Sequence, residues 1–223
     1  MSGRNYNSVP DMEQLSKFRV NRENAYEGVR QTLYDSAAYA NAGQTSLQFF
    51  QVPKGQGGKT AADTNMESAG SLPSPKKFLV ESVELLFFPG IDIGTQPAAI
   101  AETEFANDVY AFAKGGFLDF FVGSKSYLTE APLGVFPGKT RLNVDSAHAV
   151  MRTLAIAADT EDQVSADYAC MAGRPYYLAP PLLLEPTQNF NVTLNWPAVV
   201  ALPSGVDGRV VVKLDGVLYR LSQ

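Results

Sequence analysis

The sequence is poor in the residues that most catalytic and metal sites use. Its 223 residues include one histidine, His148, one cysteine, Cys170, and one tryptophan, Trp196. Proton-transfer catalysis and metal binding usually need several convergent histidine, cysteine or carboxylate side chains. The sequence therefore predicts no catalytic residue, no cofactor-binding residue and no metal ligand, and we expect a protein that is not an enzyme.

Charged residues are also few. They make up 18% of the chain, below the usual share of about 25%, and the formal net charge is -5. The first thirty residues hold five basic and four acidic side chains, so they form no basic arm for nucleic acid. We expect no direct, sequence-specific nucleic-acid binding. The low charge favours a surface covered by copies of the chain, although a large β domain with neutral loops explains it equally well.

Features of membrane and secreted proteins are missing as well. A single cysteine cannot form an internal disulfide, and the segment Met1–Asn7 lacks the apolar core of a signal peptide. No apolar run approaches the roughly 18 residues that span a bilayer. The sequence predicts a chain made in a cytoplasm and without a membrane span.

Short apolar runs separated by Gly, Pro, Asn and Asp make up much of the chain after residue 45. Their composition and period of two predict strands. The runs cover residues 47–52, 78–88, 117–122, 127–128, 176–178, 182–184, 191–196, 209–214 and 217–221. Prolines bracket 176–178 and 182–184, as is typical of edge strands, and Asp215-Gly216 predicts a two-residue hairpin turn. Residues 151–158 fit either a strand or a helix.

Two parts of the chain show helical patterns. Pro97 at the start and Gly115-Gly116 at the end delimit a predicted helix over 98–113. Near the N-terminus, Asp11–Phe18 and then the stripe Tyr26, Val29, Leu33 and Ala37 predict short helices. We therefore expect an N-terminal arm over residues 1–44 and a β domain over 45–223.

The predicted fold class is mainly β, a single antiparallel jelly-roll sandwich with one inserted helix and a partly helical N-terminal arm. Eight or so short strands with long loops are typical of such closed sandwiches. An immunoglobulin-like sandwich is the second choice, because the helix and the long loops fit it less well.

The candidate chemical motifs all have simpler explanations. Gly55–Thr60 ends like a phosphate-binding loop, but Pro53 stands where that motif requires its first glycine. Nothing around Cys170 indicates a nucleophile activated by His148. Paired acids for glycoside hydrolysis are interpreted as solvated loop and helix-start residues. These acids are Asp92, Glu102, Glu104, Asp159, Glu161 and Asp162.

Tyrosines and the helical stripe of the arm provide the candidate interaction residues. Tyr176 and Tyr177 lie beside three prolines, and tyrosine is enriched at protein interfaces. Tyr26 and Leu33 are the expected contact residues of the arm. The sequence thus predicts contacts with copies of the chain, as a trimer or a higher assembly.

Several segments together resemble a known class of proteins. They are Asp63-Thr64-Asn65-Met66, Leu72-Pro73-x-Pro75-x-x-Phe78-Leu79-Val80, and the run from Pro180-Pro181 through Pro186-Thr187-Gln188-Asn189-Phe190 to Leu194. Over roughly residues 45–223 the chain is similar to virion structural proteins of bacterial viruses, in particular jelly-roll capsid proteins. No catalytic residue carries over from them.

The resemblance implies a shell or cement protein that acts by assembling with itself and with other virion proteins. It implies that the chain is made in the host cytoplasm and ends in the virion. A carbohydrate- or receptor-binding β-sandwich module of a viral particle is the alternative function.

Overall fold

A computed structural model describes residues 26–89, 102–139 and 173–221 of the chain. Within these ranges the fold is mainly β, as expected, and it contains one α-helix, α2 (Glu102–Lys114). The strands are β1 (Tyr26–Tyr39), β2 (Ser46–Phe49), β3 (Lys77–Phe88), β4 (Phe117–Val122), β5 (Lys125–Pro132), β6 (Tyr176–Leu184), β7 (Phe190–Asn195) and β8 (Gly208–Leu221). A short 3-10 helix, η1 (Leu133–Val135), follows β5.

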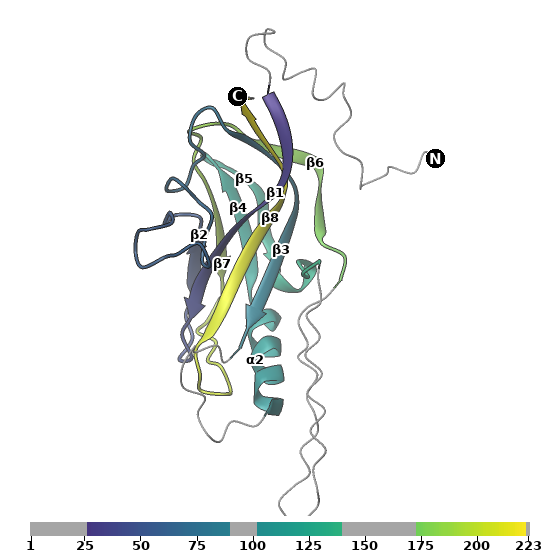
Figure 1. The fold of residues 1–223 in the computed structure, drawn as a ribbon. Helices are drawn as coiled ribbons and strands as arrows, with labels where there is room; N and C mark the ends of the chain where they lie inside the picture. The colour runs from purple at the N-terminus through teal and green to yellow at the C-terminus, as the bar shows by residue number, and fades with distance from the viewer. Residues whose placement is uncertain (1–25, 90–101, 140–172, 222–223) are drawn as a thin grey trace, which may run out of the picture.

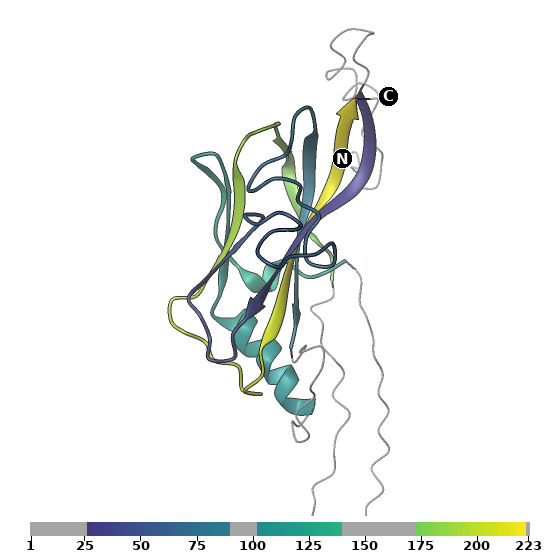
Figure 2. The same cartoon turned by 60° about the vertical axis from the view of Figure 1, so that its left-hand side comes forward.

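The strands form two antiparallel sheets of four strands each (Figures 1 and 2). The order is β1-β8-β3-β6 in the first sheet and β2-β7-β4-β5 in the second. Four of the pairs are nested along the chain: β1 with β8, β2 with β7, β3 with β6 and β4 with β5. The first strand therefore pairs with the last, and the two middle strands pair with each other.

Alternating side chains from the two sheets pack into one hydrophobic core. Phe120 of β4 and Val192 of β7 come from the second sheet, and Val83 of β3 and Leu214 of β8 come from the first; all four are fully buried. Because a strand directs every second side chain to the same face, the inner face of each sheet is apolar. This shared core holds the two sheets face to face.

Helix α2 lies at one end of the two sheets (Figure 1). Its Phe112 is fully buried and stacks on Phe87 of β3 with 4.3 Å between ring centroids. The indole Nε1 of Trp196 donates a hydrogen bond to the Phe112 carbonyl oxygen at 3.0 Å. The helix thereby covers the aromatic end of the core, where Trp196 is buried.

The helix expected over Tyr26–Ala37 is wrong, because these residues belong to strand β1. The strand pairs with β8 in one continuous register, from Tyr26 opposite Leu221 to Tyr39 opposite Gly208. A spacing of four residues, as between Val29, Leu33 and Ala37, places side chains on one face of a helix and equally on one face of a strand. Residues 26–39, expected in an arm, are thus part of the first sheet.

The hairpin turn expected at Asp215-Gly216 is also wrong, because β8 runs through it without a break. Strand β3 has an irregularity between Val80 and Ser82 opposite this dipeptide. There, a Cβ on Gly216 would lie 1.9 Å from the carbonyl oxygen of Leu79. Glycine is required at this position by the close approach of β3, and no turn is involved.

Most other strand predictions are confirmed. Strand β3 lies inside its sheet between β8 and β6. The runs 176–178 and 182–184 form the single strand β6, which lies at a sheet edge as expected. The predicted helix ends at Lys114, next to Gly115-Gly116. The helical pattern Asp11–Phe18 and residues 151–158 lie outside the described residues.

Candidate functional site

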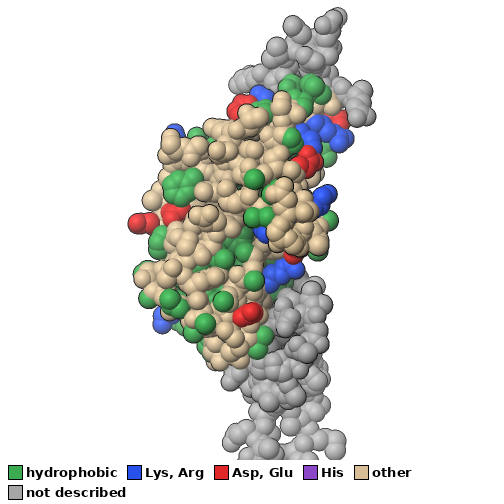
Figure 3. Space-filling model, turned by 90° about the vertical axis from the view of Figure 1, so that its left-hand side faces the viewer, with side chains coloured by type: hydrophobic (Ala, Val, Ile, Leu, Met, Phe, Trp, Pro, Cys, Tyr) green, Lys and Arg blue, Asp and Glu red, His purple; other side chains and the backbone are tan. Residues whose placement is uncertain are grey.

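A pocket of about 460 Å³ lies beside the open edge of β1. Its walls come from β1, from the glycine-rich loop between β2 and β3, and from the start of β8. The lining residues are Ser36, Ala37, Ala38, Gly57, Gly58, Lys59, Asp63, Asp207, Gly208 and Arg209. The space-filling view of this side of the molecule shows a hollow near its centre with basic side chains next to it (Figure 3).

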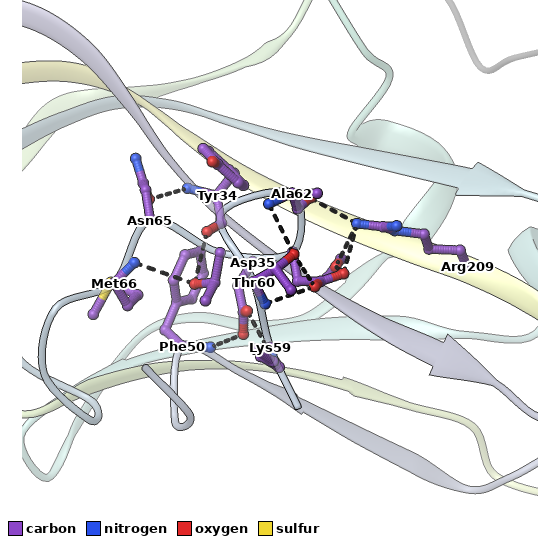
Figure 4. Close-up of polar contacts among 12 residues, drawn as sticks. Tyr34, Asp35, Phe50, Lys59, Thr60, Ala62, Asn65, Met66 and Arg209 are labelled. Atoms are coloured by element: carbon purple, nitrogen blue, oxygen red, sulfur yellow. Dashed lines mark hydrogen bonds and ion pairs between the residues drawn. The ribbon is translucent and has the colours of Figure 1, made fainter. Parts of the chain in front are cut away.

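The buried carboxylate of Asp35 pairs with Lys59 of the pocket lining (Figure 4). Asp35 lies on the inward face of β1 and is fully buried. Its Oδ1 is 2.6 Å from the Lys59 ammonium, and its Oδ2 accepts a hydrogen bond from the Phe50 backbone N–H at 2.6 Å. A buried carboxylate needs such partners, because an unpaired charge in the core is costly. Asp35 therefore fixes both ends of the segment 50–59 to β1.

A second carboxylate, Asp63, fastens the same loop on the outer side of β1. It accepts hydrogen bonds from the N–H and hydroxyl of Thr60, both at 2.8 Å, and forms an ion pair with Arg209 at 3.0 Å. These hydrogen bonds from Thr60, with the smaller effect of Arg209, hold the pKa of Asp63 below its usual value. Arg209 also donates to the Ser36 hydroxyl at 3.0 Å and to the Ala62 carbonyl at 2.7 Å.

The side chain of Asn65 covers part of the edge of β1 in place of a neighbouring strand. Its amide oxygen accepts the Tyr34 N–H at 3.0 Å, and its amide nitrogen donates to the Thr32 carbonyl at 2.7 Å. The Thr64 hydroxyl also donates to the Tyr34 carbonyl at 3.1 Å. An edge strand otherwise presents unpaired backbone groups that can pair with another chain. The loop thus protects β1 above the pocket.

A separate charged cluster surrounds Asp215, at the irregular point of β3 and β8. Its carboxylate accepts hydrogen bonds from Arg30 at 2.8 Å, from Thr32 at 2.9 Å and from Lys139 at 3.2 Å. Burial is the largest single influence and raises the pKa of Asp215, but these hydrogen bonds together outweigh it and the pKa is lowered. The same pairing raises the pKa of Arg30, chiefly through its hydrogen bond to Asp215.

The glycine-rich segment Gly55–Thr60 does not have the surroundings of a phosphate-binding loop. The Lys59 ammonium is paired with Asp35, and Thr60 is followed by a turn that Asp63 caps, with no helix. The phosphate-loop motif needs a free lysine and a helix after the glycines. The expectation that this segment is not a nucleotide site agrees with its geometry.

The structure spreads the expected interface residues over two strands. Leu33 is buried in the core, so its side chain offers no contact to a partner. Tyr26, at the beginning of β1, is partly exposed. On β6, Tyr176 packs against Phe136 with 4.9 Å between ring centroids. The Tyr177 ring centroid lies 5.4 Å from the Cζ atom of the Arg174 guanidinium. Tyr176 and Tyr177 are neighbours on the edge strand β6, which pairs with β3. Tyr26 lies on β1, which pairs with β8, so it is not on a strand next to the other two tyrosines.

Most candidate catalytic residues lie outside the described residues. These are Asp92, His148, Asp159, Glu161, Asp162 and Cys170. Glu102 and Glu104 belong to the first turn of α2. In the described ranges, no group of three or more His, Cys, Asp or Glu side chains could hold a metal ion. No helix in these ranges is long and apolar enough to cross a membrane.

Sequence reasoning missed Asp35, Asp63 and Arg209 as members of one site. A signal for Asp35 exists: it stands between Leu33, Ala37 and Tyr39 at every second position, which places an acid on the apolar face of a strand. The signal is visible only if these residues are interpreted as a strand. The helical interpretation hid it.

Comparison of the chain with protein families, with curated proteins and with solved structures found no match.

Proposed function

We propose that this chain is a structural virion protein with a jelly-roll fold, a capsid or cement protein that assembles with copies of itself. The observation that carries the proposal is the pairing of strands. A jelly roll consists of eight strands in two sheets, formed as if one long hairpin were wrapped around a barrel. Such a hairpin pairs the first strand with the last, the second with the seventh, and so on inwards.

The described strands follow this scheme in all four pairs. The additional contacts of β3 with β8 and of β4 with β7 join the hairpin pairs into two sheets, as wrapping requires. An immunoglobulin-like sandwich, the earlier second choice, has seven or nine strands and a different order. The strand order therefore supports the jelly roll, with α2 as an insertion between β3 and β4.

Two of the four edge strands, β5 and β6, differ in a way that bears on assembly. Strand β5 exposes Lys125, Thr129 and Glu130 together with Tyr127, and its charged side chains discourage edge association. Strand β6 exposes Ala179, Pro180 and Pro181, next to Tyr177. Because proline has no N–H, this edge is suited to side-chain packing and unsuited to strand addition. We place a contact between copies on β6.

Jelly rolls also serve as carbohydrate-binding domains, so the fold alone does not choose between the two functions. The alternative, a carbohydrate- or receptor-binding module of a particle, is favoured by one observation, the polar pocket beside β1. The assembly proposal is favoured by the apolar edge of β6 and by the resemblance of the sequence to virion proteins.

Electron microscopy of the purified full-length protein tests the proposal. We expect rings, sheets or closed shells, and we expect Tyr177→Ala to reduce them. Tyr127→Ala is the matched control, because Tyr127 also lies on an edge strand and also contacts a basic side chain. The Lys125 Nζ lies 4.9 Å from the centroid of the Tyr127 ring. Uniform single particles of the size of one chain, under all conditions and with both variants, would contradict the proposal.

A further inference from the structure

The free edge of β1 is covered along one half of the strand and open along the other. In the covered half, the Asn65 side chain binds the Tyr34 N–H and the Thr32 carbonyl, and an isolated bridge joins Asp35 to Thr64. Among the described residues, the part of β1 before Thr32 pairs with β8 alone. The loop that protects the strand therefore stops halfway along it.

The open half of β1 is accessible to a partner. Its residues Glu27, Gly28, Val29, Arg30 and Gln31 are all exposed, and the apolar Val29 is 40% exposed. Figure 2 shows the paired ends of β1, in purple, and β8, in yellow, turned away from the second sheet. Another chain can therefore approach this edge without meeting the rest of the sandwich.

The backbone groups of two residues face the open edge. In an antiparallel pair, successive residues of a strand direct their N–H and C=O groups to alternate sides. Because Thr32 and Tyr34 face the free edge, Gly28 and Arg30 face it as well. Such a row of backbone groups is a template for another strand. A glycine inside a strand, such as Gly28, often marks a place where another backbone approaches closely.

The charged side chains of the open half are directed away from this edge. Arg30 reaches across β8, with 2.8 Å from Nη2 to Asp215 and 3.2 Å from Nη1 to Glu81 of β3. Glu27 pairs with Arg220, which lies opposite it on β8. Charges on an edge strand discourage association when they meet a partner. Here both are neutralised over their own sheet, so they leave the edge free.

We infer that the open half of β1 pairs with the same strand of a second copy, antiparallel and around a twofold axis at Val29. In this register Gly28 of one copy lies opposite Arg30 of the other, and each such pair exchanges two hydrogen bonds. The two Val29 side chains lie opposite each other. Glu27 lies opposite Gln31, whose amide can donate to the carboxylate.

Neighbouring registers fit less well. An axis at Arg30 would place two like charges opposite each other and would require the Thr32 carbonyl, which Asn65 already occupies. An axis at Gly28 would place Glu27 opposite Val29 and would form no apolar pair. The sequence of the open half therefore selects the axis at Val29.

The pairing closes on itself. A twofold contact uses the same surface of both copies, so the open half of β1 is occupied in each and the pairing stops at a dimer. The four-stranded sheet β1-β8-β3-β6 of one copy then continues into that of the other. The inference goes beyond the proposed contact on β6, since none of the pairing residues lies on that strand.

Sedimentation equilibrium of the full-length Tyr177→Ala variant tests the dimer, because this background weakens the proposed contact on β6. We expect a monomer–dimer equilibrium. Val29→Lys should raise its Kd about tenfold or more, equivalent to about 1.4 kcal/mol, since it places like charges opposite each other at the axis. Val199→Lys is the matched control, because Val199 is 59% exposed and lies outside the strands, and it should leave the Kd unchanged.

A mixture of variants tests the register. Val29→Glu alone should weaken the dimer as Val29→Lys does, but an equal mixture of the two should recover it, because opposite charges then meet at the axis. In amide exchange measured by NMR, the Gly28 and Arg30 amides should exchange more slowly as the protein concentration rises. The Val29 amide, which faces β8, should change less.

Three results would overturn the inference. They are a monomer at every concentration in the Tyr177→Ala background, equal effects of Val29→Lys and Val199→Lys, and a mixture of the two Val29 variants that is no more dimeric than either alone. Dimers without any larger assembly of the unchanged protein would support the β1 contact and contradict the proposed shell function, so the two proposals fail separately.

Discussion

Asp35 and Lys59 form an ion pair across the base of the glycine-rich loop, with 2.6 Å between Oδ1 and Nζ. The Asp35 side chain is 0% exposed and the Lys59 side chain is 18% exposed. The acid therefore depends on the lysine far more than the lysine depends on the acid, because only the ammonium can turn to water. Removal of the lysine should therefore lower the free energy of unfolding more than neutralisation of the acid does.

Lys59→Ala should destabilise the protein by about 3–5 kcal/mol, because it leaves a buried carboxylate without its counter-charge. Asp35→Asn should cost less, about 1–3 kcal/mol, since the amide oxygen can still accept the Phe50 N–H. The double variant should be more stable than Lys59→Ala alone. Urea unfolding of the unchanged protein, the two single variants and the double variant measures these differences in the free energy of unfolding.

Lys76→Ala is the control for this cycle. Lys76 pairs with Glu67 at the same 2.6 Å, but the Lys76 side chain is 31% exposed and the Glu67 side chain is 55% exposed, so the loss of this pair should cost less than about 1 kcal/mol. If Lys59→Ala and Lys76→Ala lower the free energy of unfolding equally, the buried pair does not hold the loop.

Gly216→Ala should destabilise the fold by about 1–3 kcal/mol or more, because the new Cβ would collide with the backbone of β3. The Leu79 carbonyl oxygen is 1.9 Å from the position of that Cβ. Gly115→Ala is the matched change, since nothing lies within 4 Å of its Cβ position and its loss should be small. Thermal unfolding compares the two; equal melting temperatures would contradict the continuous β8.

Acid should weaken the fold through Asp63 and Asp215. Both have a pKa below the usual value in the folded state, so the unfolded chain takes up their protons first as the pH falls. Their stabilising contribution is present above about pH 4, the ordinary Asp value, and is lost as the pH falls through their folded pKa values. Asp215→Asn should reduce the fall in unfolding free energy between neutral pH and pH of about 3. An identical acid dependence in the variant would argue against the role of this cluster.

Deleting residues 1–25 should leave the two sheets folded, because β1 begins at Tyr26. Deleting residues 1–40 should prevent folding, because it removes β1 with the buried side chains of Leu33 and Tyr39, each worth about 2–5 kcal/mol. Far-ultraviolet circular dichroism and urea unfolding separate the two. A folded 1–40 deletion would restore the arm boundary at residue 44 that the sequence first favoured.

The parts of the fold that could be predicted from sequence are those where the local residue pattern favours one type of secondary structure. The run of β3 is rich in Val and Phe and ends at Pro89-Gly90, which favours a strand over a buried helix, and β7 alternates apolar and polar residues; both strands are present. The glycines after Lys114 end the helix as expected. In each case the neighbouring residues alone decide the structure.

The predictions of secondary structure were wrong where residues distant in the sequence determine it. β1 is a strand because β8 pairs with it along its whole length, although its sequence also fits a helix. Asp215-Gly216 fits a hairpin turn until the close approach of β3 is known. The candidate site brings together Asp35, Lys59 and Arg209 from three elements, and no spacing in the sequence indicates that they meet.

Sedimentation velocity of the purified full-length chain over a wide concentration range tests the central claim, self-assembly, most directly. One chain has a mass of 24.1 kDa. The account predicts species of at least three chains that grow with concentration and that Tyr177→Ala weakens. A single species with the mass of one chain at every concentration would contradict it.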